Sequence, residues 1–145
     1  MPFHGIHDHT LDAKNRLTVP SKARAQLANG VTLSVGLGEP CLQIWPQADH
    51  AALVQRALAQ LVPFSKEERE LKRFFYAYTE TMELDSAGRV TVPPRLAAHA
   101  GIERDVTVVG AGDCLELWNA GSWDTNDSDL ITRAAEHIQS IGHPA

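Results

Sequence analysis

The chain contains the segment Leu11-Asp12-Ala13-Lys14-Asn15-Arg16-Leu17-Thr18-Val19-Pro20, which returns 73 residues later as Leu84-Asp85-Ser86-Ala87-Gly88-Arg89-Val90-Thr91-Val92-Pro93. The same offset, without a gap, aligns Cys41-Leu42-Gln43-Ile44-Trp45 with Cys114-Leu115-Glu116-Leu117-Trp118. A module that occurs twice predicts pseudo-two-fold symmetry within one chain. Symmetric proteins commonly bind symmetric or repeated partners.

Each repeat is predicted to form two strands around a tight turn, then a short helix and two further strands. The turns contain Asn15 and its equivalent Gly88, and both residue types tolerate the positive φ that a tight hairpin often requires. Pro20 and Pro93 follow the second strand and suit the first turn of a helix. The predicted strands are residues 6–11, 16–19, 31–35 and a segment ending at Trp45, with residues 106–109 and a segment ending at Trp118 in the second repeat.

Helical periodicity marks the region between the repeats and the C-terminal segment. Apolar residues within 53–61 have helical spacing, a capping box at residues 65–68 precedes a second helix, and residues 130–141 repeat the spacing. We expect these helices to cover the β-core and to link the repeats. The predicted division is a first repeat at 1–50, a helical linker at 51–78, a second repeat at 79–123 and an acidic C-terminal helix at 124–145.

The composition is that of a globular domain, with 145 residues of which 43% are hydrophobic. No segment reaches the roughly 20 apolar residues that a membrane span needs, and residues 1–5 do not begin a signal peptide. We therefore expect a cytoplasmic protein without membrane contact. Cys41 and Cys114 occupy equivalent repeat positions, which predicts a shared packing role, with a disulfide as the alternative.

The net charge of −5 argues against a nucleic-acid partner until its distribution is considered. Residues 1–30 hold four Lys or Arg against two Asp, together with three His. Residues 106–145 hold six acids against a single arginine. The acidity therefore belongs largely to the C-terminal part, and a basic N-terminal surface remains open.

The residues that flank each turn are the main candidates for chemistry. Asp12 with Arg16, and Asp85 with Arg89, are four residues apart, which suits a structural ion pair that fixes the turn. The cations Lys14, Arg16, Lys22 and Arg24 lie within eleven residues on the first turn and the helix after it. Clustered cations suit phosphate contact, and arginine can also bind a guanine edge with two hydrogen bonds. A solvated charged face is the alternative interpretation.

The second repeat has fewer of these cations. Arg89 and Arg95 remain, but Lys14 aligns with Ala87 and Arg24 aligns with Ala97. We therefore expect the N-terminal module to dominate any binding, with the C-terminal module serving mainly as a scaffold.

Metal and catalytic sites are weakly indicated. His4, His7 and His9 with Asp8 resemble a metal-binding cluster, but no second ligand group accompanies them. The sequence has no G-x-S-x-G, Walker A, H-E-x-x-H or C-x-x-C motif. We expect no enzyme activity, no cofactor, no metal and no small-molecule ligand, and we keep a small barrel enzyme with a histidine-bound metal as a third hypothesis.

The doubled Asp-x-x-x-Arg turns, each followed by a proline, a short helix and two strands, resemble the MraZ family of bacterial transcriptional regulators. The resemblance covers roughly residues 3–123 and rests on segments 11–20 and 84–93, with Leu115-Glu116-Leu117-Trp118 and Trp123. It implies a mainly β fold in which two swapped hairpins form a double-split, AbrB-like barrel with covering helices.

The resemblance also implies a function. Proteins of this family assemble into rings and bind short direct DNA repeats upstream of the division and cell-wall gene cluster, which they repress. On this chain it implies a DNA-binding surface made by Lys14 and Arg16 with Lys22 and Arg24, and Arg89 as the corresponding residue of the second hairpin. A nucleoid-associated homo-oligomer is therefore expected.

The main alternative is an antitoxin-like interaction module. In that interpretation the acidic C-terminal helix neutralises a protein partner, and deletion of residues 124–145 abolishes the complex.

Overall fold

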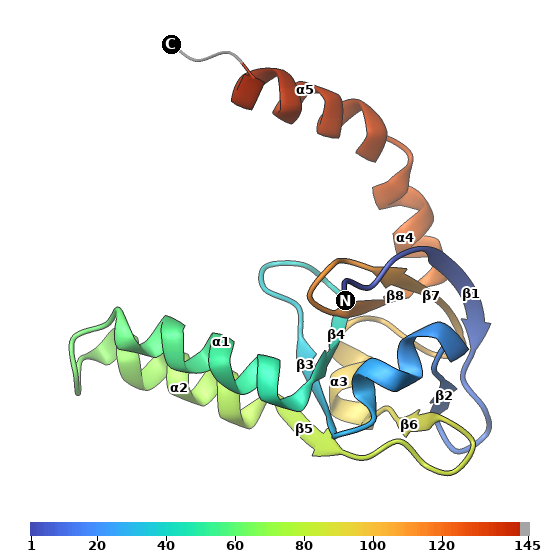
Figure 1. Cartoon of the computed structure of the whole chain (residues 1–145), viewed down its shortest axis with the longest axis horizontal. Coiled ribbons are helices and arrows are strands. Elements are labelled where there is room, and N and C mark those ends of the chain that lie inside the picture. The colour runs from blue at the N-terminus through green and yellow to red at the C-terminus, as the bar shows by residue number, and fades with distance from the viewer. Residues whose placement is uncertain (143–145) are drawn as a thin grey trace.

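The structure is a computed structural model that describes residues 1–142 (Figure 1). Its strands are β1 (Ile6–Thr10), β2 (Arg16–Thr18), β3 (Val31–Val35), β4 (Leu42–Pro46), β5 (Thr79–Met82), β6 (Arg89–Thr91), β7 (Asp105–Gly110) and β8 (Leu115–Asn119). Its helices are the 3-10 helix η1 (Ser21–Leu27) and the α-helices α1 (Gln47–Ala59), α2 (Lys66–Ala77), α3 (Pro94–His99), α4 (Ala120–Asp127) and α5 (Leu130–Gly142). The strands for which the sequence predicts bounds are confirmed to within one residue at each end.

The two repeats exchange strands. A six-stranded sheet has the order β1-β7-β8-β4-β3-β5, and β2 and β6 form a separate two-stranded ribbon. All pairs are antiparallel. Strand β1 of the first repeat pairs with β7 of the second, and β5 of the second repeat pairs with β3 of the first. In the ribbon Leu17 lies opposite Val90. A β-core of two interleaved repeats with helices is confirmed, but strand pairing within residues 1–142 forms no closed barrel.

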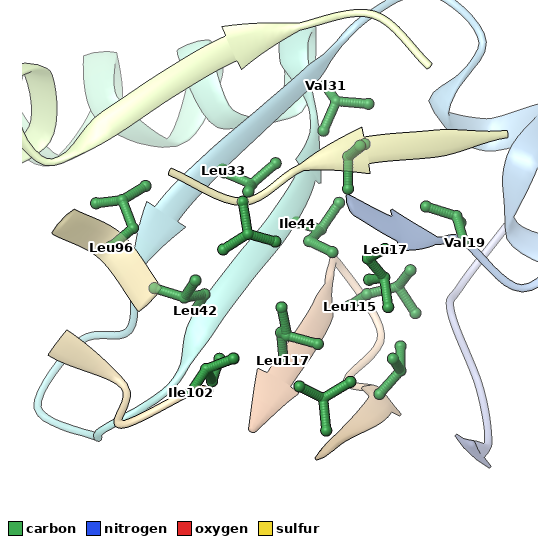
Figure 2. Packing of buried hydrophobic residues seen from close by; sticks show 14 of the residues in the cluster. Leu17, Val19, Val31, Leu33, Leu42, Ile44, Leu96, Ile102, Leu115 and Leu117 are labelled. Carbon is green, nitrogen blue, oxygen red and sulfur yellow. The ribbon is translucent and has the colours of Figure 1, made fainter. Parts of the chain in front are cut away.

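The hydrophobic core joins the six-stranded sheet to the ribbon (Figure 2). Leu17 and Val19 of the first repeat, with Val90 and Val92 of the second, belong to one buried cluster with the inward residues of β3, β4, β7 and β8. Leu27 of η1 and Leu96 of α3 belong to the same cluster. Burying one such side chain fully contributes about 1.5–3 kcal/mol, so the short ribbon is held chiefly by these contacts.

The expectation that the helices cover the β-core is correct only in part. The helices α1 and α4 begin directly after β4 and β8 and bury His50, Val54 and Trp123. Figure 1 shows α1 and α2 as a hairpin that extends away from the sheet, and α5 as an arm beyond α4. None of residues 130–142 of α5 is buried, so the prediction is wrong for this helix. Periodicity reveals an apolar helix face but does not identify the surface that covers it.

Details of the helices refine other predictions. Ser65 Oγ accepts a hydrogen bond from the Glu68 N–H at 3.2 Å, as the capping box predicts, but the Glu68 carboxylate accepts from Phe64 N–H at 3.0 Å rather than from Ser65. Residues 143–145, which complete the predicted segment 124–145, lie outside the described residues. No helix within residues 1–142 combines the length and the apolar character that membrane crossing requires.

The two cysteines are free and buried, as their predicted packing role requires. Cys41 packs with Val109, Trp118 and Trp123. Burial is the main reason that the pKa of each thiol rises to about 12, which leaves both thiols protonated at neutral pH. The disulfide alternative is not realised.

We predict that Leu17→Ala lowers the free energy of unfolding by about 3 kcal/mol, because Leu17 is fully buried between the ribbon and the sheet. Its exposed neighbour Thr18 provides the control, and Thr18→Ala should change that free energy by less than about 0.5 kcal/mol. Urea unfolding followed by circular dichroism measures both. Equal losses would contradict the inward orientation of Leu17.

Candidate nucleic-acid interface

Each hairpin turn is organised by one aspartate. Asp12 Oδ1 accepts hydrogen bonds from the backbone N–H groups of Lys14 and Arg16, both at 2.9 Å, and Oδ2 accepts from Arg16 Nε at 2.7 Å. The turn closes with the Asp12 N–H donating to the Arg16 carbonyl at 3.0 Å. One carboxylate therefore fixes the turn and orients the arginine side chain.

The second turn has the same arrangement. Asp85 Oδ1 accepts from the N–H groups of Ala87 and Arg89 at 2.9 Å, and Oδ2 accepts from Arg89 Nε at 2.7 Å. Backbone hydrogen bonds from Arg16 and Arg89 are the largest cause of the lowered pKa values of Asp12 and Asp85, and the arginine side chains lower them further. Both carboxylates are therefore ionised at neutral pH.

Each turn is also bound to the other repeat. Asn15 and Gly88 both have positive φ, 57° and 75°, as the repeat alignment predicts for these turn positions. The Val92 N–H donates to the Asn15 carbonyl at 2.8 Å, and the Val19 N–H donates to the Gly88 carbonyl at 2.9 Å. These two hydrogen bonds continue the pairing of β2 with β6 on either side of the ribbon.

The outward side of the ribbon carries a surface that we call the ribbon face, formed by Arg16, Thr18, Arg89 and Thr91. The register places Arg16 opposite Thr91 and Thr18 opposite Arg89, while Leu17 points inward. The two arginine side chains are 27% and 30% exposed, and both threonines are exposed. Because Nε of each arginine is held by an aspartate, the Nη groups remain as donors for an external acceptor.

The other predicted cations take different positions. Lys14 is exposed at the first turn, beside Asn15. Lys22 is exposed on η1 and lines a cavity with His4 and His7, so no described contact joins it to the ribbon face. Arg24 donates from Nε to the Val19 carbonyl at 3.0 Å.

The structure also identifies residues that the sequence analysis missed. Thr18 and Thr91 belong to the ribbon face, and only the strand register shows that each lies opposite an arginine. For Arg95, the cation that the second repeat retains at the position of Lys22, only the structure shows the cation–π contact with Tyr78, at 5.4 Å from the ring centre. The alternation of Arg16, Leu17 and Thr18 along a strand was the available signal for the threonines.

The histidine cluster does not form a metal centre in the described part of the chain. His7 and His9 share one side of β1, as alternation predicts. No group of three or more His, Cys, Asp or Glu within residues 1–142 is arranged to hold a metal ion.

We predict that the turn aspartates make stability dependent on acid. Their folded-state pKa values lie below the ordinary 3.8, so their stabilising effect is present above that value and is lost as the pH falls through the lowered pKa. The urea midpoint of the wild type should therefore decrease between about pH 5 and about pH 3 more than that of D12N/D85N, which cannot ionise.

The charge-matched control for this experiment is D127N/D129N, outside the turns. It should follow the wild type across the pH range. Parallel curves for the wild type and D12N/D85N would contradict the role assigned to the two carboxylates.

Comparison with known proteins identifies the family. The family model described as "MraZ protein, putative antitoxin-like" matches twice, over residues 3–74 and 75–139. The chain is similar to the protein named "Transcriptional regulator MraZ" of Lachnoclostridium phytofermentans, with 34% identity over 97% of each chain. A protein of the same name from Kineococcus radiotolerans is 39% identical over 96% of each chain. Another from Limosilactobacillus fermentum is 38% identical over 92% of this chain and 94% of the relative.

These matches confirm the resemblance stated from the doubled turns. They also confirm the expectation that the protein is not an enzyme, because the family comprises transcriptional regulators. The chain belongs to the MraZ family of transcriptional regulators.

Proposed function

We propose that this regulator is a sequence-specific DNA-binding repressor of the division and cell-wall gene cluster. It binds short direct repeats upstream of its own gene as a ring-shaped homo-oligomer in the cytoplasm, associated with the nucleoid. The single observation that carries the proposal is the exposed ribbon face, on which two arginines are held in equivalent orientations by Asp12 and Asp85.

The chemistry of the ribbon face suits DNA. A guanidinium whose Nε is already bound presents its remaining N–H groups in a fixed direction, and this geometry matches the acceptor edge of guanine or a phosphate. The threonine hydroxyls opposite the arginines are further donors that suit phosphate oxygens. We assign base recognition to Arg16 and Arg89, with Lys14 and Lys22 contacting the DNA backbone.

The charges support repeated rather than single contacts. Asp12 offsets much of the charge of Arg16, and the chain has a net charge of −5, so one ribbon face alone binds DNA weakly. A ring that places several ribbon faces on consecutive DNA repeats raises the effective concentration of each contact after the first. Direct repeats suit a heterologous, cyclic arrangement of subunits.

The exposed apolar residues of α5 support self-association. The helix is amphipathic, but its apolar residues are not covered by the rest of the described chain. Their exposed fractions are 84% for Ile131, 68% for Ile138 and 83% for Ile141. An apolar stripe of this kind marks a surface that another protein covers. We assign it to contact between neighbouring subunits.

Two finer structural assignments accompany this proposal. The sheet and the ribbon together act as the two parts of a double-split, AbrB-like barrel, and the chain divides functionally into residues 1–50, 51–78, 79–123 and 124–145. The exchange of strands between repeats supports the first assignment.

A second candidate function is supported by the same helix. The matching family model is described as antitoxin-like, and α5 offers an amphipathic face with acidic residues before it, among them Asp124, Asp127 and Asp129. In this candidate the helix binds a protein partner of another sequence. A stable hetero-complex in a pull-down with the full chain, lost on deletion of residues 124–145, would favour it over self-association.

We predict that Arg16→Ala weakens binding to the DNA upstream of the protein's own gene by at least about tenfold, because each bidentate arginine–guanine contact contributes about 1–3 kcal/mol. Fluorescence anisotropy with this duplex and a shuffled duplex, at two salt concentrations, measures the effect. The wild type should prefer the native duplex, and its affinity should fall steeply with salt because several phosphates are contacted at once.

Arg73→Ala is the matched control, since it removes the same charge from an exposed position on α2. It should leave both the affinity and the sequence preference close to those of the wild type. If Arg16→Ala binds as tightly as Arg73→Ala, the ribbon face does not recognise DNA.

We predict that Ile131→Asp with Ile138→Asp reduces the molecular mass in solution, because both isoleucines are exposed on α5 and no described part of the chain covers them. Light scattering after size-exclusion chromatography measures the mass, and circular dichroism checks the fold. Gln139→Asp, on the same helix, should leave the mass unchanged. If the double variant has the same molecular mass as the wild type, α5 does not form the contact between subunits.

A further inference from the structure

The two turns differ in the cations that their own repeats supply. The first turn contains Lys14 and Asn15, where the second has Ala87 and Gly88. The helices after the turns differ in the same sense, because η1 carries Arg24 where α3 carries Ala97. By sequence alone, both differences place a cation in the first repeat at a position where the second repeat has alanine.

Arg24 does not stay with the turn of its own repeat. Its Nε donates to the Val19 carbonyl, and the Val19 N–H donates to the Gly88 carbonyl, so one backbone unit links Arg24 to the second turn. A Cβ placed on Gly88 would lie within 2.7 Å of Arg24 Cδ and Cζ, and closer still to Nε. The Arg24 side chain therefore lies directly over the Cα of Gly88.

This position explains two of the differences between the repeats. A side chain at position 88 would require the Arg24 side chain to shift, and the φ of 75° there also favours glycine. At the equivalent turn position Asn15 carries a side chain, and the residue aligned with Arg24 is the small Ala97. The first turn therefore has asparagine where the second turn has Gly88, and α3 has alanine where η1 has Arg24.

We propose that Arg24 is the phosphate-binding residue of the second turn, so that each end of the ribbon contacts DNA with a pair of cations. The first pair is Lys14 with Arg16, and the second is Arg24 with Arg89. The inference rests on the proposed DNA-binding function and assigns the second repeat an active part in it. Within residues 1–142 the hydrogen bonds of Arg24 use Nε, which leaves its Nη groups for the ligand.

The chemistry favours a phosphate over a base as the ligand of Arg24. Its guanidinium is held against backbone at Val19 and Gly88, outside the row of side chains on the ribbon face. A cation in that position meets the edge of a bound duplex, where phosphate oxygens lie, rather than the base edges at the centre of the groove. Arg24 should therefore add affinity without adding sequence preference.

The first test compares Arg24→Gln with Arg24→Lys in the anisotropy experiment. Arg24→Gln should weaken binding to the native and shuffled duplexes alike, by about tenfold, and should make the salt dependence shallower by about one unit of slope per contacting subunit. Arg24→Lys keeps the charge and should keep most of the salt dependence. Thermal unfolding of both variants separates this effect from a loss of the hydrogen bond to Val19.

The second test locates the contact with a double-mutant cycle. Arg24→Gln combined with Arg89→Ala should deviate from additivity in binding, because both residues contact DNA at the second turn. Arg24→Gln combined with Lys14→Ala should be additive, because these residues serve opposite ends of the ribbon.

Three results would overturn the inference. Normal DNA affinity in Arg24→Gln, with only a lowered unfolding temperature, would make Arg24 purely structural. Non-additive effects on DNA binding between Arg24→Gln and Lys14→Ala, but not Arg89→Ala, would place the DNA contact of Arg24 at the first turn. A wild-type chain that binds neither duplex would refute the proposed function itself, and the inference with it.

Discussion

The carboxylates of Asp12 and Asp85 each accept three hydrogen bonds within their own turn, two from backbone N–H groups and one from the arginine Nε–H. These hydrogen bonds fix the backbone of both turns, so that the carbonyls of Asn15 and Gly88 meet the other repeat. The cross-repeat bonds in turn extend a ribbon whose inward residues complete the core. Local hydrogen bonding at two short turns therefore supports the interleaving of the two repeats at the ribbon.

The same carboxylates also limit what the surface can do alone. An aspartate that orients an arginine necessarily neutralises part of its charge, so directional precision is gained at some loss of long-range attraction. This balance suits a protein that distinguishes sequences by many repeated contacts better than one that relies on a single tight contact. Under the proposed function it also reconciles an acidic chain with a DNA partner, because the attraction would be local to the ribbon and the turns.

Much of the fold was predictable because the sequence repeats it. The alignment of Asn15 with Gly88 and the four-residue spacing of Asp12 and Arg16 correctly indicated the turns and the contacts within them. Contacts between residues far apart in the chain gave no periodic signal. The contact of Arg24 with Gly88 depends on the exchange of hairpins, and the exposure of α5 depends on the direction that α4 takes after β8.

The exchange of strands has an evolutionary consequence. Two repeats on separate chains would share one sequence, and any change in the turn would occur twice. Because one chain supplies both repeats, each turn can vary independently while the other is preserved. One example of such divergence is the contact of Arg24 with Gly88. The residues aligned with these two in the other repeat are Ala97 and Asn15. Covalent linkage thus converts a symmetric scaffold into one whose two turns can diverge separately.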